Sequence, residues 1–246
     1  MKKNKKPLIP PKSQVQDFLR LNFPEKSTPL WRTFLGLRDT TRYDLARFAN
    51  PMIPYDMQDA FRNNSIIKIY VKNSFLQNLP IEFPQRASYG LFSFDGSKLR
   101  YLAASHLQNL TELLREEATP IHELNASVFS RFLCEILINH GYHKNDVISS
   151  DAALRNFYFM NISKDSLRYN INEFEYEKYK NMLFTPKIHT VSSGWIIRFV
   201  TASGEKYDRQ NLGIEEIEIT KDYKITTGNR HVLSTNTFLN TPDIVN

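Results

Sequence analysis

The sequence predicts an α+β fold, in which a helical, basic N-terminal part precedes a central buried helix and a mostly antiparallel β C-terminal part. Three observations support this prediction. Apolar residues recur at helical spacing near the N-terminus and again over residues 125–140. An Asp-Gly pair separates two strand-like runs near residue 95. Several β-rich runs follow residue 195, with turn residues between them.

Short helices are expected in the first part of the chain. Apolar residues lie three and four apart over residues 13–23, 28–35 and 41–50, and a proline opens or follows each run. The third helix is expected to place Ala49 on its inward face. A further turn or two of helix is expected over residues 54–62.

A strand and a hairpin are expected next. Residues 65–71 form a β-rich run. Two further β-rich runs flank Asp95-Gly96, a pair that tolerates the positive φ of a tight turn, so a β-hairpin is predicted over residues 89–102. Ser105 is the expected cap of the helix that follows.

The predicted helix over residues 125–140 carries a wide apolar stripe, formed by Val128, Phe129, Phe132, Leu133, Ile136 and Leu137. Gly141 follows it, where a left-handed C-terminal cap is expected. Cys134 lies in the middle of the apolar helix, so its thiol is expected to be buried and inert. This helix is therefore the expected centre of the core.

The last hundred residues are predicted to be mainly antiparallel β. Strands are expected over residues 157–162, 195–201, 214–220 and 224–234. Ser203-Gly204 and Gly228-Asn229 are the expected turns. Residues 172–183 fit a helix better than a strand. The acidic run from Glu215 to Glu218 is expected on a solvated strand face.

Three regions are expected along the chain. Residues 1–12 read as a disordered basic tail, residues 13–141 as a helical and mixed part, and residues 142–246 as a mainly antiparallel β part. A boundary between the two folded parts is expected in the polar stretch over residues 142–151. One continuous domain over both parts is the alternative that the length leaves open.

Composition excludes several classes of protein. The sequence has only 8 glycines and no G-x-G, which excludes the usual dinucleotide-binding turn, Walker A loop, kinase glycine loop and nucleophile elbow. Its single cysteine excludes an internal disulfide and a C-x-x-C pair. No run approaches the ~18 apolar residues of a membrane helix. The chain is therefore expected to be cytoplasmic, with no membrane partner and no evident cofactor.

Charge is divided unevenly between the two halves of the chain. Residues 1–100 hold 17 Lys and Arg against 8 Asp and Glu, whereas residues 101–246 hold 15 against 18. Arginines and aromatic residues cluster in the basic half, namely Arg32, Arg38, Arg42, Arg47, Trp31 and Tyr43. Arginine binds phosphate and aromatic rings stack on bases, so this cluster predicts a nucleic-acid-binding surface. A helical surface salt-bridged by Asp39 and Asp44 is the alternative.

Two weak metal patterns are present. His140, His143 and Asp146 lie close together and include imidazole and carboxylate ligands, although a helix C-terminus also favours histidine. Asp208 with Asp222 and Lys224 has the order of a PD-(D/E)xK nuclease, in which carboxylates hold Mg²⁺ and lysine orients water. A turn at Asp222 is the alternative to this catalytic interpretation.

The leading functional hypothesis is a protein that contacts DNA or RNA through its basic N-terminal half, as a subunit of a nucleoprotein assembly or, in its sharper form, as a Mg²⁺-dependent nuclease. The alternative is a non-enzymatic adaptor whose oppositely charged halves dock on a protein partner. An enzyme acting on a small anionic substrate is a third reading. The sequence leaves open whether the chain is an enzyme.

Overall fold

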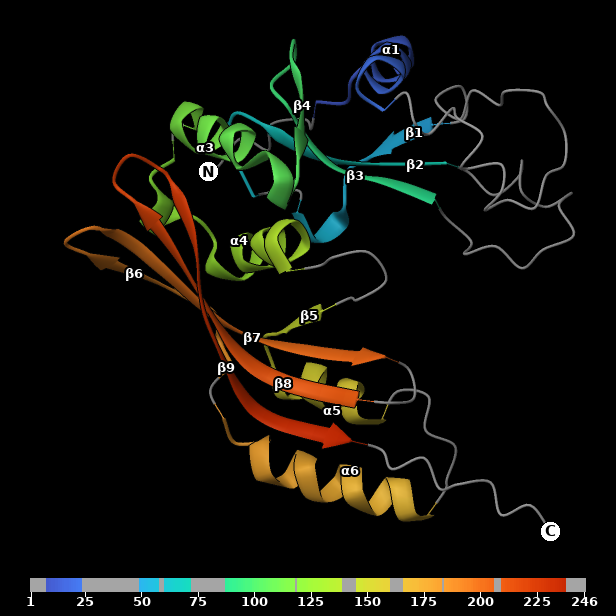
Figure 1. Cartoon of the computed structure of the whole chain (residues 1–246), viewed down its shortest axis with the longest axis vertical. Coiled ribbons are helices and arrows are strands. Elements are labelled where there is room, and N and C mark those ends of the chain that lie inside the picture. The colour runs from blue at the N-terminus through green and yellow to red at the C-terminus, as the bar shows by residue number, and fades with distance from the viewer. Residues whose placement is uncertain are drawn as a thin grey trace, which may run out of the picture. The chain divides into compact units, whose positions relative to one another are not determined.

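The computed structural model describes residues 8–23, 49–57, 60–71, 87–117, 119–138, 145–159, 166–182, 184–205 and 209–237. The chain divides into two compact units, Met1–Ala118 and Thr119–Asn246, here called the first and second unit. Each unit contains an antiparallel sheet and helices, which confirms the α+β class (Figure 1). The boundary expected in the polar stretch over residues 142–151, and its alternative of one continuous domain, stay predictions.

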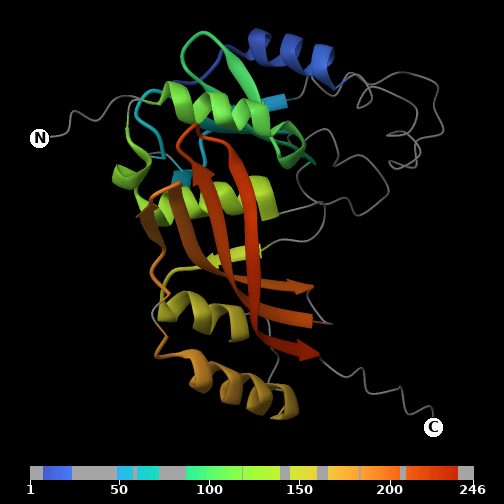
Figure 2. The same ribbon diagram turned by 60° about the vertical axis from the view of Figure 1, so that its left-hand side comes forward.

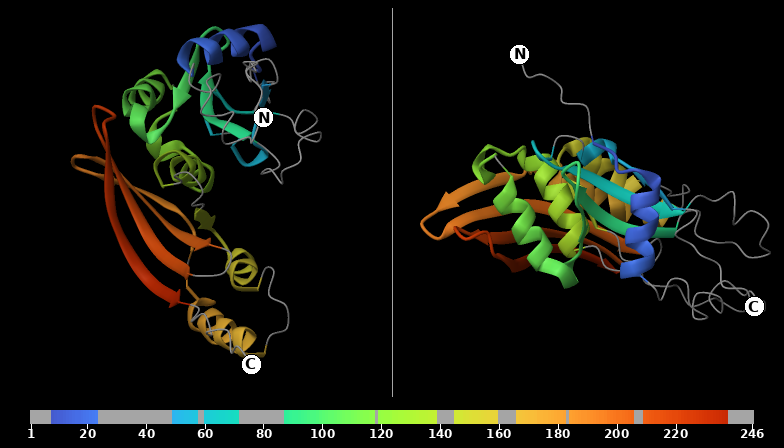
Figure 3. Two further views of the ribbon diagram at one scale, coloured as in Figure 1. Left: turned by 45° about the vertical axis from the view of Figure 1, so that its right-hand side comes forward. Right: turned by 90° about the horizontal axis from the view of Figure 1, so that it is seen from above.

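The first unit is built on a four-stranded sheet in which the strands pair in chain order. These strands are β1 (Ala49–Met52), β2 (Ser65–Val71), β3 (Ala87–Phe94) and β4 (Leu99–Leu102). Helix α1 (Lys12–Asn22) crosses the strands, as the right-hand view of Figure 3 shows, and α3 (Leu107–Glu116) follows β4. Single 3-10 turns lie at Tyr55–Met57 and Ala104–His106.

One face of the first sheet packs against α1. The helix contributes Val15 and Leu19, which are almost completely buried, and the sheet contributes a row of alternating residues. This row consists of Ala49, Ile67, Ile69, Phe92, Phe94 and Leu99. Because side chains alternate between the faces of a strand, Ser93 and Arg100 lie on the other face, where both are buried.

The second unit contains a five-stranded sheet with the order β5-β7-β8-β9, and β6 pairs with β7 as well. Its strands are β5 (Asn145–Ile148), β6 (Lys187–Val191), β7 (Gly194–Glu205), β8 (Arg209–Thr220) and β9 (Ile225–Thr237). Its helices are α4 (Ala126–Leu133), a π-helical turn (Cys134–Ile138), α5 (Asp151–Phe159) and α6 (Ser166–Tyr179), with a 3-10 turn at Ile121–Glu123. Figure 2 shows α5 and α6 side by side below the long strands.

Both faces of the second sheet bury apolar residues. Val200, Ala202 and Leu212 pack with Tyr158 of α5 and Tyr176 of α6 in one cluster. The opposite face contains a second set of buried residues, Ile197, Phe199, Ile217 and Ile219. The long strands therefore hold the core of this unit together.

Most of the predicted elements are confirmed. The hairpin over residues 89–102, the strand over 65–71 and the three later β runs form as expected. Asn125 caps α4 by accepting hydrogen bonds from the backbone N–H groups of Ser127 and Val128. The helix expected over residues 28–35, and residues 41–48 of the helix expected over 41–50, lie outside the described residues.

Two element types were predicted wrongly. Residues 49–52 form strand β1 instead of a helix end, because they pair with β2 and bury Ala49 completely. The start of the expected strand over residues 157–162 is the last turn of α5 instead, because helical spacing from Leu154 to Tyr158 buries both side chains in one cluster.

Three local signals were also misread. Ser203-Gly204 is not a turn, because it continues the regular pairing of β7 with β8. Gly228-Asn229 lies within β9 at a register shift, because glycine marks β-bulges as well as turns. The tight turn falls at residues 221–224 instead. Ser105 is not the helix cap, since α3 begins after His106 without a side-chain cap.

Candidate functional site

The structure describes few of the residues predicted to bind nucleic acid or metal. Arg32, Arg38, Arg42, Arg47, Trp31, Tyr43, His140, His143 and Asp208 lie outside the described residues. Asp146 lies on β5 and is exposed. Within the described ranges, no three His, Cys, Asp or Glu side chains gather as metal ligands would.

Asp222 and Lys224 lie in the turn between β8 and β9. The carboxylate Oδ2 of Asp222 is 3.1 Å from Nζ of Lys224, and Oδ1 accepts a hydrogen bond from the Thr220 hydroxyl. These contacts, that of Thr220 first, lower the pKa of Asp222. The arrangement is that of a turn stabilised by its own side chains. It brings two of the three predicted nuclease residues together without any described metal ligand beside them.

The same turn contains an aromatic contact that sequence reasoning missed. The rings of Trp195, at the start of β7, and Tyr223 are stacked, with centroids 5.7 Å apart and planes 30° apart. Tyr223 has a φ of 65°, in the left-handed region that few residues other than glycine adopt. No sequence signal joins two aromatic residues 28 positions apart, so only the pairing of β7 with β8 reveals this contact.

Charge within the first unit is distributed unevenly along the chain. Its described residues hold seven Lys and Arg against six Asp and Glu, which nearly balance. In contrast, residues 1–7, 24–48 and 72–86 hold eleven against four. The positive excess of the N-terminal half therefore belongs to stretches outside the described sheet and helices.

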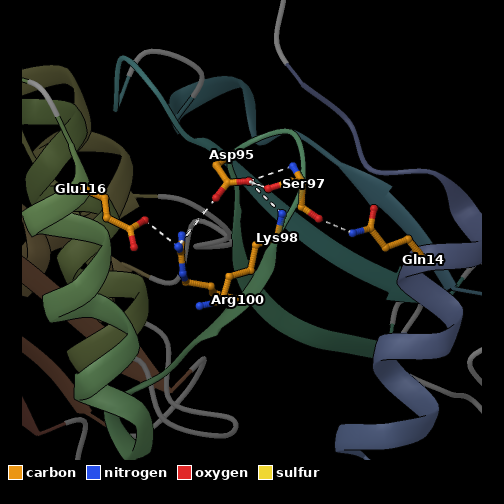
Figure 4. A network of polar contacts seen from close by, with 6 residues as sticks. All are labelled: Gln14, Asp95, Ser97, Lys98, Arg100 and Glu116. Carbon is orange, nitrogen blue, oxygen red and sulfur yellow. Dashed lines mark hydrogen bonds and ion pairs between the residues drawn. The ribbon is translucent and has the colours of Figure 1, made fainter.

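Five of the six described acids of the first unit make local contacts, including Glu112, which accepts a 3.2 Å hydrogen bond from Gln108. Asp17 pairs with Arg20 at 3.2 Å on α1, where both side chains are exposed. The carboxylate of Glu117 is buried and accepts hydrogen bonds of 3.0–3.2 Å from the backbone N–H groups of Arg62 and Asn63. Asp95 and Glu116 belong to the network drawn in Figure 4.

That network surrounds Arg100 at the β3–β4 turn (Figure 4). Nη2 of the buried Arg100 lies 2.5 Å from Glu116 Oε2 and 3.7 Å from Asp95 Oδ2. Asp95 Oδ1 accepts hydrogen bonds of 2.8 Å from the backbone N–H groups of Ser97 and Lys98. These bonds, that of Lys98 first, outweigh desolvation and lower the pKa of Asp95 to about 2. Asp95 therefore stabilises the turn, and Glu116 pairs with the buried Arg100.

A buried polar group in the second unit was also missed. Glu215 is 7% exposed, accepts a 2.7 Å hydrogen bond from the Thr201 hydroxyl and pairs with Arg230 Nε at 3.1 Å. The expected solvated face holds Glu216 and Glu218 only. The alternation that places Glu215 on the face of Ile217 was a usable signal.

The thiol of Cys134 is buried, as the apolar helix predicted. Burial, followed by the nearby carboxylates of Glu215, Glu135 and Asp146, raises the pKa of Cys134 to about 12. The thiolate required of a nucleophile or a metal ligand is therefore strongly disfavoured.

The described helices include none long and apolar enough to cross a membrane. Comparisons with protein families, curated proteins and solved structures find no significant match to this chain.

Proposed function

We propose that the chain contacts DNA or RNA through the arginine-rich segment over residues 31–47. The observation that carries this proposal is the charge division within the first unit. The described sheet and helices are almost neutral, whereas eleven of the unit's Lys and Arg residues lie in three other stretches with only four acids. Such an excess attracts a polyanion and releases its counterions on binding.

The contacts of the described acids support this proposal. Asp95, Glu116 and Glu117 are committed to the hairpin turn, to Arg100 and to backbone N–H groups. The carboxylate of Glu117 in particular is buried and therefore inaccessible to further arginines. The segment over residues 31–47 contains four arginines but only two acids, Asp39 and Asp44. Part of its positive charge therefore remains available for phosphate.

Fluorescence anisotropy of labelled DNA and RNA, single-stranded and duplex, tests this proposal over a range of salt concentrations. The variant Arg38→Ala, Arg42→Ala, Arg47→Ala is expected to bind more weakly at low salt. Its plot of log affinity against log salt should flatten by roughly 0.7–0.9 for each lost phosphate contact.

A matched control removes the same number of charges from exposed positions of the second unit. These are Lys178, Lys187 and Arg198, each replaced by Ala. The control is expected to keep most of the affinity. If the arginine variant instead binds unchanged and unfolds more easily, its arginines pair with Asp39 and Asp44, and the protein-interaction adaptor becomes the better explanation.

The nuclease form of the proposal is tested by adding Mg²⁺ to the same mixtures. It requires Asp208 and Asp222 to hold the metal and Lys224 to orient water. Mg²⁺-dependent cleavage that disappears in Asp222→Asn supports this form. Binding without cleavage identifies a non-catalytic contact.

A further inference from the structure

Two turns at one end of the second sheet carry an aromatic pair beside two lysines. The turn between β6 and β7 precedes Trp195, and the turn between β8 and β9 contains Lys221, Tyr223 and Lys224. The stacked rings of Trp195 and Tyr223 are both partly exposed, whereas both lysines are exposed. Aromatic rings next to cations are the groups that bind unpaired nucleotides in proteins.

Backbone contacts hold these two turns together. The N–H of Lys221 donates a 3.0 Å hydrogen bond to the Ser193 carbonyl, and the N–H of Tyr223 donates one of 2.8 Å to the Thr220 carbonyl. Gly194 brings the turns into close contact, because a Cβ at this position would collide with the backbone of Ile219. The aromatic pair is therefore held in place before any ligand arrives.

Tyr223 occupies a backbone conformation that does not suit it. Its φ of 65° favours glycine or asparagine, yet the position carries a large ring that stacks on Trp195. A strained residue with a specific side-chain contact is a reason to look for a function of that side chain.

The two lysines differ in their partners. Lys224 pairs with Asp222 at 3.1 Å, and Asp222 also accepts from Thr220. Lys221 has no acidic partner within the described part of the chain. Its exposed ammonium group therefore remains available for an anion.

We propose that Trp195, Tyr223 and Lys221 form a contact for single-stranded nucleic acid. An unpaired base stacks on the exposed part of the aromatic pair, and Lys221 binds the adjoining phosphate. This inference rests on the proposed nucleic-acid function and adds a second contact, in the second unit. Any base has a π-face, so the contact is tolerant of sequence and selective for unpaired strands.

Tryptophan fluorescence reports on this contact directly. The sequence contains two tryptophans, so Trp31→Phe leaves Trp195 as the single emitter. Because Trp31 lies in the segment of the proposed function, the parent chain is titrated beside this variant, each with labelled oligothymidylate and oligouridylate of about ten nucleotides, with duplex DNA and with inorganic phosphate. Anisotropy is measured on the parent chain and Trp195 emission on the variant. We expect both single strands to quench Trp195, and the duplex and phosphate to leave its emission unchanged.

Two substitutions separate stacking from charge. Tyr223→Gly removes the ring and suits the left-handed backbone, so the fold should be retained while single-strand affinity falls about tenfold. Lys221→Ala is expected to flatten the salt dependence by roughly 0.7, the value for one phosphate contact to a single strand. Lys187→Ala and Phe174→Ala remove an exposed cation and an exposed aromatic ring elsewhere, and should change neither quantity.

The outcomes distinguish this contact from the proposed function. Oligonucleotide binding by anisotropy, with unchanged Trp195 emission and full affinity in Tyr223→Gly, would refute the contact and leave the proposed function standing. Absence of any anisotropy change at low salt would remove both. Quenching that Tyr223→Gly abolishes would establish the contact.

Discussion

The β3–β4 and β8–β9 hairpins adopt left-handed backbone in different ways. In the first, Gly96 takes a φ of 105° and Asp95 accepts the hydrogen bonds that close the turn. In the second, Tyr223 takes a φ of 65° and stacks on Trp195, while Asp222 bonds to Thr220. The bonds that close the first turn come from adjacent residues, although Gln14 and Arg100 also contact it, whereas the aromatic contact of the second turn comes from another strand.

This difference shows why one turn was predictable and the other was not. An Asp-Gly pair predicts a tight turn from the sequence alone, because glycine has no Cβ to oppose positive φ. A tyrosine in the same conformation is stabilised by a partner 28 residues away, which no local pattern reveals. Three predictions test whether the second turn is the more sensitive to its surroundings.

The largest effect is expected at Gly194, which lies beside the β8–β9 turn. Its φ is 152°, and a Cβ there would collide with the Ile219 carbonyl and lie 2.8 Å from the Thr220 Cα. Both obstacles are backbone atoms, so Gly194→Ala forces β7 and β8 apart. We expect a loss of about 3 kcal/mol in the free energy of unfolding, measured by urea denaturation. An unchanged midpoint would show that the two turns are not tightly packed.

A smaller effect is expected for the equivalent change in the first hairpin. Gly96 also has positive φ, but among the described residues a Cβ there would meet only Leu8 Cδ1, at 3.5 Å, an ordinary contact. Gly96→Ala therefore incurs only the conformational cost, roughly 1–2 kcal/mol. Urea denaturation of the two alanine variants side by side measures the difference. Equal losses would mean that close packing adds nothing at Gly194.

Local patterns in the sequence predicted the strand over residues 65–71 and the hairpin over 89–102 because each depends on neighbouring residues. Strand β1 depends on pairing with β2, which overrides the helical spacing before Ala49. Gly228 lies at a register shift within β9 and not in a turn. Because β-bulges and turns both favour glycine, the sequence alone does not distinguish them. The strand expected over residues 157–162 was wrong for a local reason, since Leu154 and Tyr158 have the spacing of a helix face.

The candidate sites also differ in how much of each could be predicted from local sequence. A turn at Asp222 was recognised as an alternative from sequence, since aspartate is common in turns. The burial of Glu215 follows from strand alternation, but its bond to Thr201 requires the register of β7 with β8. The aromatic pair required the full topology of the second unit. Charge segregation, in contrast, was visible in the sequence alone.

The smallest effect is expected from the acid titration of the two turn aspartates. Hydrogen bonds from Lys98 and Ser97 hold the pKa of Asp95 at about 2, below its ordinary value of 3.8. A carboxylate with a lowered pKa in the folded state stabilises the fold above its unfolded pKa. That stabilisation is lost as pH falls from about 4 to about 2. Because solvent screens this turn, we expect the contribution to be about 1 kcal/mol.

Comparing urea midpoints at pH 5 and near pH 2 in the parent protein and in Asp95→Asn isolates this contribution. The variant should already lack the stabilisation at pH 5, so its own change between the two pH values should be smaller. Asp222→Asn is the matched control, because Asp222 also has a lowered pKa but its carboxylate is open to solvent. If the two variants respond alike, the backbone N–H groups that bind Asp95 are not what distinguishes the first turn from the second.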